Sequence, residues 1–440
     1  MKALNRIDPS LSGVAWTKTS KEASVAYPAL DTDKDVDLVV IGAGYAGLSI
    51  ALHAAKAGLS VCVLDAGVVG AGASGRNGGF VVPHFPGALR PAQVEQRLGK
   101  RKGGALIELV GDGPAQVFER IKKYQIRCDA DQRGWAQPAH SEKALAKVRA
   151  VYEDWKALGA PVEWLDEAGI ASALGAKGYL GGWRRMSGGS INPYALCIGL
   201  ARAAVSEGVK IHERCTVDKV VRENGLAVAH CGKLSVRGRK LIIATNGYTG
   251  TLWPDLPRSG IAVRLYHCAT EPLSQDLQRQ IMPVRTCFTD LRKSGGFSRY
   301  DADGRIISGG AVFTLANAQR YGLAHANRRM AELFPQLAGH PPKIESYWEG
   351  YCSITDGYLP NFQVLDENIY SLIGFSTRGI ALSQNIGRLI GEFLAEQRLL
   401  DDVPLEVVHG VRAISYHGFK ERMGGLIFPL YQRMDRYGLS

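Results

Sequence analysis

The chain has 440 residues, of which 46% are hydrophobic and 52 are Gly, a Gly share well above the roughly 7% of an average protein. With only 19 Pro, this composition excludes a collagen-like fibre and a low-complexity linker, and the length predicts two or three domains. The net charge of +11 favours acidic partners, but the basic residues are scattered and no nucleic-acid-reading motif accompanies them, so no nucleic-acid partner is expected.

The cysteines and the N-terminus indicate a reducing compartment. Eight Cys lie far apart without a Cys-x-x-Cys pair, which excludes a zinc ribbon or a thioredoxin-type motif, and we expect no metal site. Several, such as Cys62, stand in apolar runs typical of buried thiols, and the first residues show no secretory signal, so a cytoplasmic location is expected. Residues 38–55 carry no formal charge, but their three Gly and change of period predict a strand followed by a helix rather than a membrane span.

A dinucleotide-binding motif stands between a predicted buried strand at 38–41 and a predicted helix at 48–56. The turn reads Gly42-Ala43-Gly44-Tyr45-Ala46-Gly47. In such a motif the first Gly permits the tight turn, the second lets a pyrophosphate approach the backbone, and the third lets helix and strand pack closely. The helix N-terminus offers free N–H groups to the phosphates. A second strand at 60–64 ends at Asp65 and Ala66, where a carboxylate accepts hydrogen bonds from the adenosine ribose.

A second glycine-rich loop distinguishes FAD from NAD as the dinucleotide. Five Gly occur between residues 70 and 79, shortly after the ribose carboxylate, whereas a simple NAD domain enters its next helix with ordinary composition. Such a loop can wrap a longer cofactor, with Ser74 and Arg76 able to reach phosphate and Phe80 carrying the chain past a ring. The residues expected at FAD here are Ala73, Ser74, Gly75, Arg76, Asn77, Gly78 and Gly79.

Further motifs are spread along the chain. They are the Gly-Ala-Ser-Gly-Arg-Asn-Gly-Gly run at 72–79, residues 120–126, residues 187–193, Trp348-Glu349-Gly350 and residues 387–392. With these motifs the chain resembles the amine- and amino-acid-oxidising FAD flavoproteins of the D-amino acid oxidase superfamily, which include the glycine and sarcosine oxidases. The resemblance covers roughly residues 25–400 and is closest to the bacterial gamma-glutamylputrescine oxidases.

The resemblance implies an α/β fold with a discontinuous Rossmann-like FAD-binding domain and an interleaved α+β substrate domain containing an antiparallel sheet. We expect an N-terminal arm at 1–35, FAD-binding segments at 36–95, 187–255 and 345–400, substrate-domain segments at 96–186 and 256–344, and a C-terminal packing segment at 401–440. Near the cofactor the resemblance implies the Val217 backbone, the end of the strand at 241–247 and the helix N-terminus after residue 373. The residues expected there are Val217, Ala244, Thr245, Gly247, Gly374, Ser376, Thr377, Arg378, Gly379 and Ile380.

Four aromatic residues are the candidates for the substrate face: Tyr266, Trp348, Tyr351 and Phe80. Tyr266 and His267 are adjacent in a predicted strand, so their side chains face opposite ways and only one can face the flavin. We expect Tyr266 to face it and His267 to be structural. Flavin performs the redox step, and no Ser-His-Asp or paired-carboxylate signature is present, so no strong acid or base is required.

Two departures from relatives bear on the substrate and the cofactor linkage. Amino-acid-oxidising members carry an Arg shortly after Trp-x-Gly that pairs with the substrate carboxylate, whereas Tyr351-Cys352-Ser353 follows here. The position of Cys352 relative to Asp356 does not match the covalent attachment of sarcosine oxidases, so FAD is expected to be non-covalent.

The sequence therefore predicts an FAD-dependent amine oxidase or dehydrogenase that acts on CH–NH or CH–NH2 and passes electrons to O2 or another acceptor. We expect a polyamine derivative as the substrate, in polyamine catabolism. An amino-acid or opine dehydrogenase with a non-oxygen acceptor and an electron-transfer or binding flavoprotein without its own substrate remain as alternatives. The oligomeric state stays open.

Overall fold

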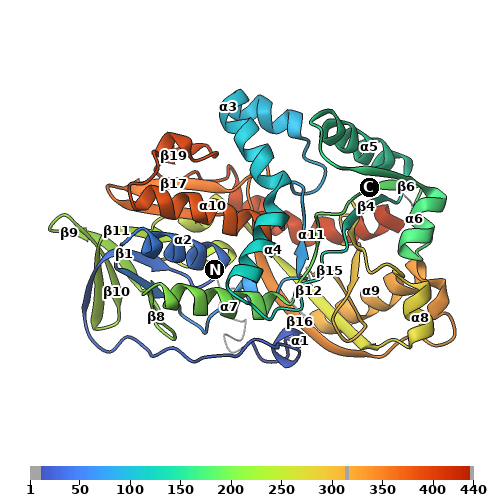
Figure 1. Ribbon diagram of the computed structural model, residues 1–440, viewed down its shortest axis with the longest axis horizontal. Helices are drawn as coiled ribbons and strands as arrows, with labels where there is room; N and C mark the ends of the chain where they lie inside the picture. The colour runs from blue at the N-terminus through green and yellow to red at the C-terminus, as the bar shows by residue number, and fades with distance from the viewer. Residues whose placement is uncertain (1–10, 313–316, 437–440) are drawn as a thin grey trace.

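The computed structural model describes residues 11–312 and 317–436 (Figure 1). Residues 1–10 of the expected arm, residues 437–440 of the expected C-terminal segment and residues 313–316 lie outside the described residues. Two large sheets occupy the two halves of the molecule, with nine and eight strands. The chain crosses between these halves several times, so each half is built from discontinuous segments. This agrees with the predicted α/β fold with an interleaved α+β second domain.

A parallel core forms the centre of the nine-stranded sheet. Its strands in spatial order are β18 (Ile369–Ile373), β11 (Leu234–Ile243), β1 (Lys34–Ile41), β2 (Val61–Leu64) and β8 (Lys210–His212). In β1, Ile41 pairs with Leu64 of β2 on one side and Ile243 of β11 on the other. The carboxyl ends of these strands therefore meet at one edge, which is where ligands bind in open α/β sheets.

Further strands, mostly antiparallel to their neighbours, extend this core on the side of β11 that faces away from β1. They are β9 (Lys219–Glu223), β10 (Leu226–Cys231), β17 (Asn361–Asp366) and β19 (Val407–His409), of which β19 runs parallel to β17. Side chains alternate between the sheet faces: Leu38 and Val40 face the helix-covered core, whereas Val39 and Ile41 pack in a second core with Val220. Both faces are thus buried, which explains the continuous apolar run of β1.

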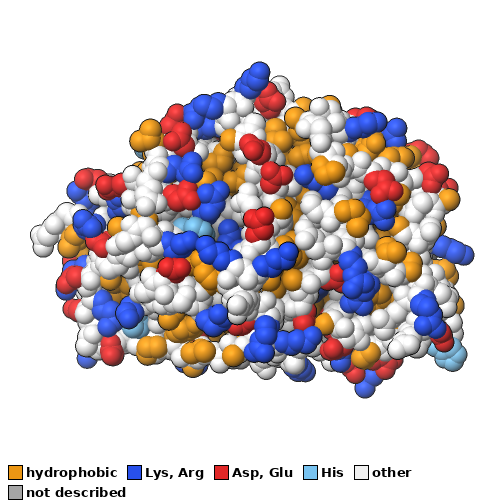
Figure 2. Space-filling model, in the orientation of Figure 1, with side chains coloured by type: hydrophobic (Ala, Val, Ile, Leu, Met, Phe, Trp, Pro, Cys, Tyr) orange, Lys and Arg blue, Asp and Glu red, His pale blue; other side chains and the backbone are white. Residues whose placement is uncertain are grey.

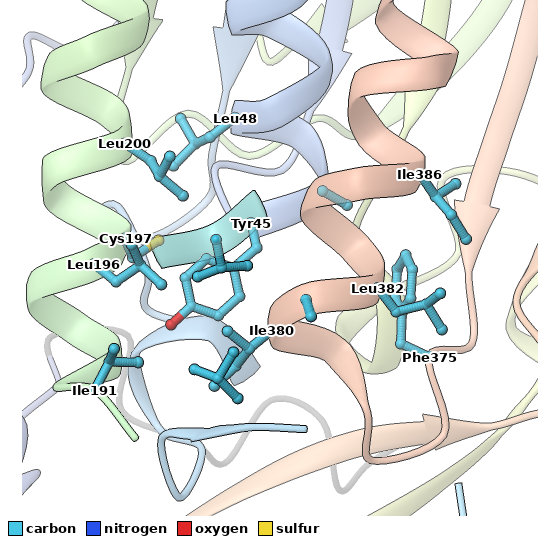
Figure 3. Packing of buried hydrophobic residues seen from close by; sticks show 14 of the residues in the cluster. Tyr45, Leu48, Ile191, Leu196, Cys197, Leu200, Phe375, Ile380, Leu382 and Ile386 are labelled. Carbon is cyan, nitrogen blue, oxygen red and sulfur yellow. The ribbon is translucent and has the colours of Figure 1, made fainter. Parts of the chain in front are cut away.

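Three helices cover one face of this sheet: α2 (Tyr45–Lys56), α7 (Pro193–Ser206) and α10 (Gly379–Leu394). In Figure 3, Tyr45 of α2 lies between Cys197 of α7 and Ile380 of α10. The Tyr45 hydroxyl donates to the Pro193 carbonyl at 2.7 Å. A Cβ on Gly387 of α10 would lie 2.9 Å from the Ser49 side chain, so this Gly permits α10 to approach α2 closely. The packing orients the N-terminal ends of α2 and α10 toward the same edge of the sheet.

The eight-stranded sheet runs in the order β16-β12-β15-β14-β13-β4-β6-β5. Its strands are β4 (Trp135–Ala139), β5 (Glu163–Asp166), β6 (Gly181–Arg185), β12 (Ile261–Pro272), β13 (Cys287–Thr289), β14 (Phe297–Tyr300), β15 (Arg305–Ala311) and β16 (Ile344–Ile354). The expected boundary at 345 assigns β16 to the FAD-binding segments, but β16 pairs antiparallel with β12 along its length. Strand β16 is therefore the edge strand of the eight-stranded sheet and not part of the nine-stranded one.

The remaining elements surround the two sheets. They are α1 (Ala15–Lys18), α3 (Pro91–Gly111), α4 (Gly113–Lys123), α5 (Glu142–Ala157), α6 (Glu167–Leu174), α8 (Gln275–Gln280), α9 (Ala318–Leu333), α11 (His417–Arg436) and a small sheet of β3 (Phe80–Val81) with β7 (Gly189–Ser190). The arm brings α1 against the centre of the molecule, where the Trp16 indole donates to the Asn77 carbonyl at 2.8 Å.

The distribution of charge over the surface follows the scattered basic residues of the sequence. On the face shown in Figure 2, Lys and Arg are interspersed with Asp and Glu instead of forming one continuous basic tract. Among the described residues, none of the helices has the length and apolar character needed to cross a bilayer.

Candidate active site

A cavity of about 1140 Å³ extends from the carboxyl edge of the nine-stranded sheet to the face of the eight-stranded sheet. At one end it is lined by the turn between β1 and α2, and at the other by β12, the chain before β14, and β16. A cavity of this extent at the edge of a parallel sheet can hold an extended dinucleotide and a second ligand beyond it.

The glycine-rich turn forms the first end of the cavity. Gly42 has a φ of +109°, and a Cβ there would lie 2.9 Å from the Ala244 carbonyl oxygen. A Cβ on Gly47 would lie 2.0 Å from the Gly42 carbonyl oxygen, so this Gly lets α2 begin directly against β1. Gly42, Gly44, Tyr45 and Ala46 line the cavity, whereas Gly47 packs behind it. The N-terminus of α2 therefore faces the cavity with the positive end of its helix dipole.

Asp65 and Ala66 line the cavity at the end of β2. The Asp65 carboxylate accepts hydrogen bonds from the backbone N–H groups of Ala43 at 2.7 Å and Gly67 at 2.8 Å. Burial raises the pKa of the Asp65 carboxyl, and these two N–H donors oppose that rise. The carboxylate thus ties the glycine-rich turn to the end of β2, and its remaining acceptor capacity faces the predicted ribose position.

The second glycine-rich loop folds back on itself beside α2. Ser74 Oγ accepts the N–H of Tyr45 at 3.0 Å. Arg76, which the sequence predicts at a phosphate, is buried and donates to the carbonyl oxygens of Ala71 at 2.8 Å and Glu349 at 3.3 Å. The guanidinium thus links the loop to β16. Gly75 and Gly79 do not line the cavity; they permit close contacts with backbone carbonyls behind it.

Other predicted cofactor residues form the adjoining wall. The cavity is lined by Ala73, Ser74, Arg76, Asn77, Gly78, Phe80, Val217, Ala244, Thr245, Ser376, Thr377, Arg378, Gly379 and Ile380. Gly247 lies against the backbone of Cys352, and Gly374 has a φ of +89°, where a Cβ would lie 2.1 Å from a Thr355 methyl carbon. These two shape the wall from behind. A wall made largely of Gly and Ala backbone fits a long cofactor that the backbone approaches closely, as FAD requires.

The expectation for Tyr266 and His267 is wrong, and the structure reverses it. His267 lines the cavity, whereas Tyr266 points to the opposite face of β12 and packs against α9. The Tyr266 hydroxyl lies 2.6 Å from His325 Nδ1, and its ring stacks on Tyr347 at 5.6 Å. Side chains of adjacent strand residues point to opposite faces of the sheet. Tyr266 lies on the face of β12 that packs against α9, and His267 lies on the face toward the cavity.

Burial lowers the pKa of His267 to about 3, and the nearby Arg299 guanidinium lowers it further in the same direction. The imidazole in the cavity is therefore neutral. Its ring stacks on Trp348 at 5.7 Å and lies 5.5 Å from Phe297, which in turn meets Phe80 edge-on at 5.5 Å. These rings form an aromatic, uncharged patch at this end of the cavity, beside the charged residues Asp290, Arg292 and Lys293.

Trp348, expected as an aromatic wall, does not line the cavity. It lies opposite His267 in the β12–β16 register, and its indole donates to the Arg76 carbonyl at 2.8 Å. Trp348 therefore supports His267 from behind. Tyr351 and Cys352 do line the cavity; Tyr351 N–H donates to the Tyr248 hydroxyl at 3.0 Å, and burial raises the pKa of Cys352 to about 12.

Several cavity residues have no counterpart among the sequence-based candidates. They are Tyr248, Val263, Leu265, His267, Asp290, Arg292, Lys293 and Phe297. The alternation of side chains along β12 places Val263, Leu265 and His267 on one face of the strand. It does not indicate that this face is the one that lines the cavity. Within the described ranges, no group of three or more His, Cys, Asp or Glu side chains could hold a metal ion.

Comparison with known proteins agrees with this geometry. Residues 37–393 match the family described as DAO, FAD dependent oxidoreductase. The chain is 34% identical over 370 residues to gamma-glutamylputrescine oxidoreductase of Escherichia coli (strain K12), covering 84% of this chain and 85% of that protein. It is 30% identical over 427 residues to the probable oxidoreductase OrdL of Haemophilus influenzae, covering 95% and 96%.

The solved structure of glycine oxidase from Geobacillus kaustophilus matches with a TM-score of 0.69 at 19% identity, covering 83% of this chain and 95% of that one. This likeness confirms the fold. The family match spans more than half of the chain and includes both glycine-rich loops and the N-terminus of α10. This chain belongs to the DAO family of FAD-dependent oxidoreductases, and its cofactor is FAD.

Proposed function

We propose that the protein oxidises the C–N bond of an amine, with a polyamine derivative such as gamma-glutamylputrescine as the substrate class. FAD, when bound, accepts a hydride from the carbon next to nitrogen and is reoxidised by O2, which is reduced to H2O2. The resulting imine reacts with water to give an aldehyde and the released amine or ammonia. The name of the 34%-identical relative, gamma-glutamylputrescine oxidoreductase, supports this substrate class.

The observation that carries the proposal is the neutral aromatic patch of the cavity beyond the predicted cofactor position. His267, Phe297 and Leu265 line it, and the His267 imidazole is uncharged at physiological pH because burial lowers its pKa to about 3. An amine must be neutral to release a hydride, and desolvation against such a surface lowers the amine pKa. The chain's own residues therefore exclude water and orient the substrate, while no side chain is required as a strong base.

We further propose that the segments 36–95, 187–255 and 355–400 hold the cofactor and that β16 belongs to the substrate-covering part. Apart from β19 at its edge, the nine-stranded sheet draws its strands from these segments, while β16 pairs with β12. We place the reaction in the cytoplasm, because all eight cysteines are free and a reducing compartment preserves free thiols.

Anaerobic mixing of the purified yellow enzyme with a panel of amines and amino acids tests the function. We expect gamma-glutamylputrescine to bleach the flavin absorbance and O2 to restore it rapidly with one H2O2 per aldehyde. Bleaching that O2 reverses only slowly would indicate the alternative dehydrogenase. A flavin that no member of the panel bleaches would overturn the proposed enzyme activity and favour an electron-transfer protein.

The variant Gly44→Val tests the position of the cofactor. In this variant the Cβ added at position 44 would lie 2.9 Å from Ser74 Oγ, and the two methyl groups of the valine would occupy the cavity at the N-terminus of α2. We expect a folded protein that purifies without FAD. Purification of this variant as a yellow protein with full FAD content would contradict the predicted pyrophosphate position.

A further inference from the structure

A guanidinium without an acidic partner faces the cavity from the start of α10. Arg378 is the N-cap residue of this helix and lines the cavity. Its Nη2 donates to the Thr289 hydroxyl at 3.2 Å, and its Nε is buried without a hydrogen-bond partner. No ion pair joins Arg378 to an acidic residue within 11–312 and 317–436. Thr289 also accepts the Trp135 indole N–H at 3.1 Å, so it is a shared and neutral partner.

The other cationic side chains of the cavity have partners. Arg292 forms an ion pair with Asp290, and the Lys293 ammonium lies 4.3 Å from the centre of the Tyr431 ring. Arg76 donates to backbone carbonyls. Arg378 thus differs from Arg292 in having no acidic partner, and from Arg76 in having a buried Nε that no acceptor satisfies. Burial without an acid lowers the pKa of Arg378 to about 10, so the side chain still carries its charge at neutral pH.

A buried charge without a counter-ion is costly, by several kcal/mol, and such charges in proteins are paired or bind ligands. The direction of the side chain indicates which ligand. From α10 it runs to Thr289 of β13 and stands 5.8 Å from the Trp135 ring of β4, both in the eight-stranded sheet. The predicted pyrophosphate position, at the N-terminus of α2, is on the other sheet. Arg378 therefore extends toward the substrate end.

The chain also lacks an arginine where amino-acid-oxidising relatives are expected to carry one. Tyr351 and Cys352 line the cavity after Trp348-Glu349-Gly350, and neither can form an ion pair with a carboxylate, because a phenol and a thiol carry no positive charge. A guanidinium offers two parallel N–H donors that match the two oxygens of a carboxylate. Arg378 can supply this pairing from a different element of the fold.

We propose that Arg378 binds the carboxylate of the amine substrate and thereby selects carboxylate-bearing amines over neutral amines and simple diamines. The assignment rests on the proposed amine oxidation. It makes Arg378 a specificity-determining residue and predicts that the substrate's anionic group lies near Thr289, at the sheet side of the cavity, while its reacting C–N bond lies at the flavin.

A matched pair of substrates tests the proposal in the FAD-loaded enzyme: gamma-glutamylputrescine, and the same molecule with its carboxylate replaced by a carboxamide. In the wild type we expect a KM at least 10-fold lower for the carboxylate. In Arg378→Gln and Arg378→Lys we expect that KM to rise by about 10- to 100-fold, as loss of a charge-assisted hydrogen bond implies, with the carboxamide nearly unaffected. Equal changes for both substrates would overturn the proposal.

A second readout avoids turnover. Titration of the oxidised enzyme with glutarate, followed through the flavin absorbance, gives a Kd for a carboxylate without an amine, and we expect Arg378→Gln to raise it in parallel with KM. The flavin reduction potential should stay unchanged. A shifted potential with an unchanged glutarate Kd would show that Arg378 serves the flavin instead.

Arg120→Gln is the control for removing a buried guanidinium packed on α10. Arg120 is buried and donates to Gln384 of α10 at 3.0 Å, but it does not line the cavity. Its loss should leave the ratio of the two KM values unchanged. If the wild-type flavin is reduced by neither substrate nor any other amine, the proposed function fails; if it is reduced with equal KM by both, only the assignment of Arg378 fails.

Discussion

Acidification should destabilise this protein through three histidines that fold in the neutral form. His84, His267 and His325 are buried, and burial lowers the pKa of each to about 3 from an ordinary value of 6.5. Below pH 6.5 the unfolded chain binds protons at these positions while the folded chain does not, so stability falls as the pH decreases toward 3. At about 1.36 kcal/mol per pH unit, each histidine contributes a loss of about 2 kcal/mol at pH 5.

His84 allows the effect to be isolated. Its Nδ1 accepts the Trp155 indole N–H at 3.0 Å, so protonation at this nitrogen would break the hydrogen bond. In His84→Gln the amide oxygen can still accept this N–H, but no group titrates. Urea unfolding followed by Trp fluorescence, with saturating FAD, should show about 2 kcal/mol less stability loss between pH 7 and pH 5 than in the wild type.

Only the difference between the two proteins reports His84, because all other groups titrate in both. His409→Gln, which removes an exposed imidazole of β19, serves as the control for changing one histidine. An identical pH-dependent loss in the wild type and His84→Gln would refute the assignment, since it would mean that His84 has the same proton affinity in the folded and unfolded chains.

Two further changes test the packing around the site. Gly47→Ala places a Cβ 2.0 Å from the Gly42 carbonyl, so we expect a loss of about 1–3 kcal/mol and weaker FAD binding, measured by calorimetric unfolding and by FAD titration of the apoprotein. Gly104→Ala in α3, where no atom lies within 4 Å of the added Cβ, is the control and should be neutral or stabilising. Asp435→Ala removes the carboxylate that accepts the N–H groups of residues 293–294, so their amide hydrogens should exchange at least 10-fold faster; unchanged exchange would show that α11 does not hold this loop.

The cofactor end of the fold could be predicted from the sequence because its signals are local. Gly42, Gly47 and Asp65 lie within one strand–turn–helix–strand unit, where the spacing of residues directly determines their positions in space. The close contact of Gly47 with Gly42 follows from that geometry. The role of Arg76 was less accessible, because its partner Glu349 is supplied by a strand 273 residues further along the chain.

The substrate end could not be predicted because it depends on contacts between distant segments. The alternation in β12 indicates that Tyr266 and His267 face opposite ways, but only the packing of α9, with His325, decides that the tyrosine turns away. The same limit applies to Trp348, whose place behind His267 follows from the β12–β16 register. The sheet to which β16 belongs depends in the same way on its pairing with β12, which begins 83 residues earlier in the chain.

The charges of the substrate end connect selectivity with the chemistry of the amine. At the substrate end Asp290 is already paired with Arg292, so the residues that line this end offer a diamine no unpaired carboxylate, and the positive charge of Arg378 repels its second ammonium group. That same charge lowers the pKa of a bound amine, as the neutral surface around His267 also does. A carboxylate-bearing amine satisfies the guanidinium and loses its proton more easily than it would in water, so one cationic side chain serves both requirements without an acid or base at the reacting carbon.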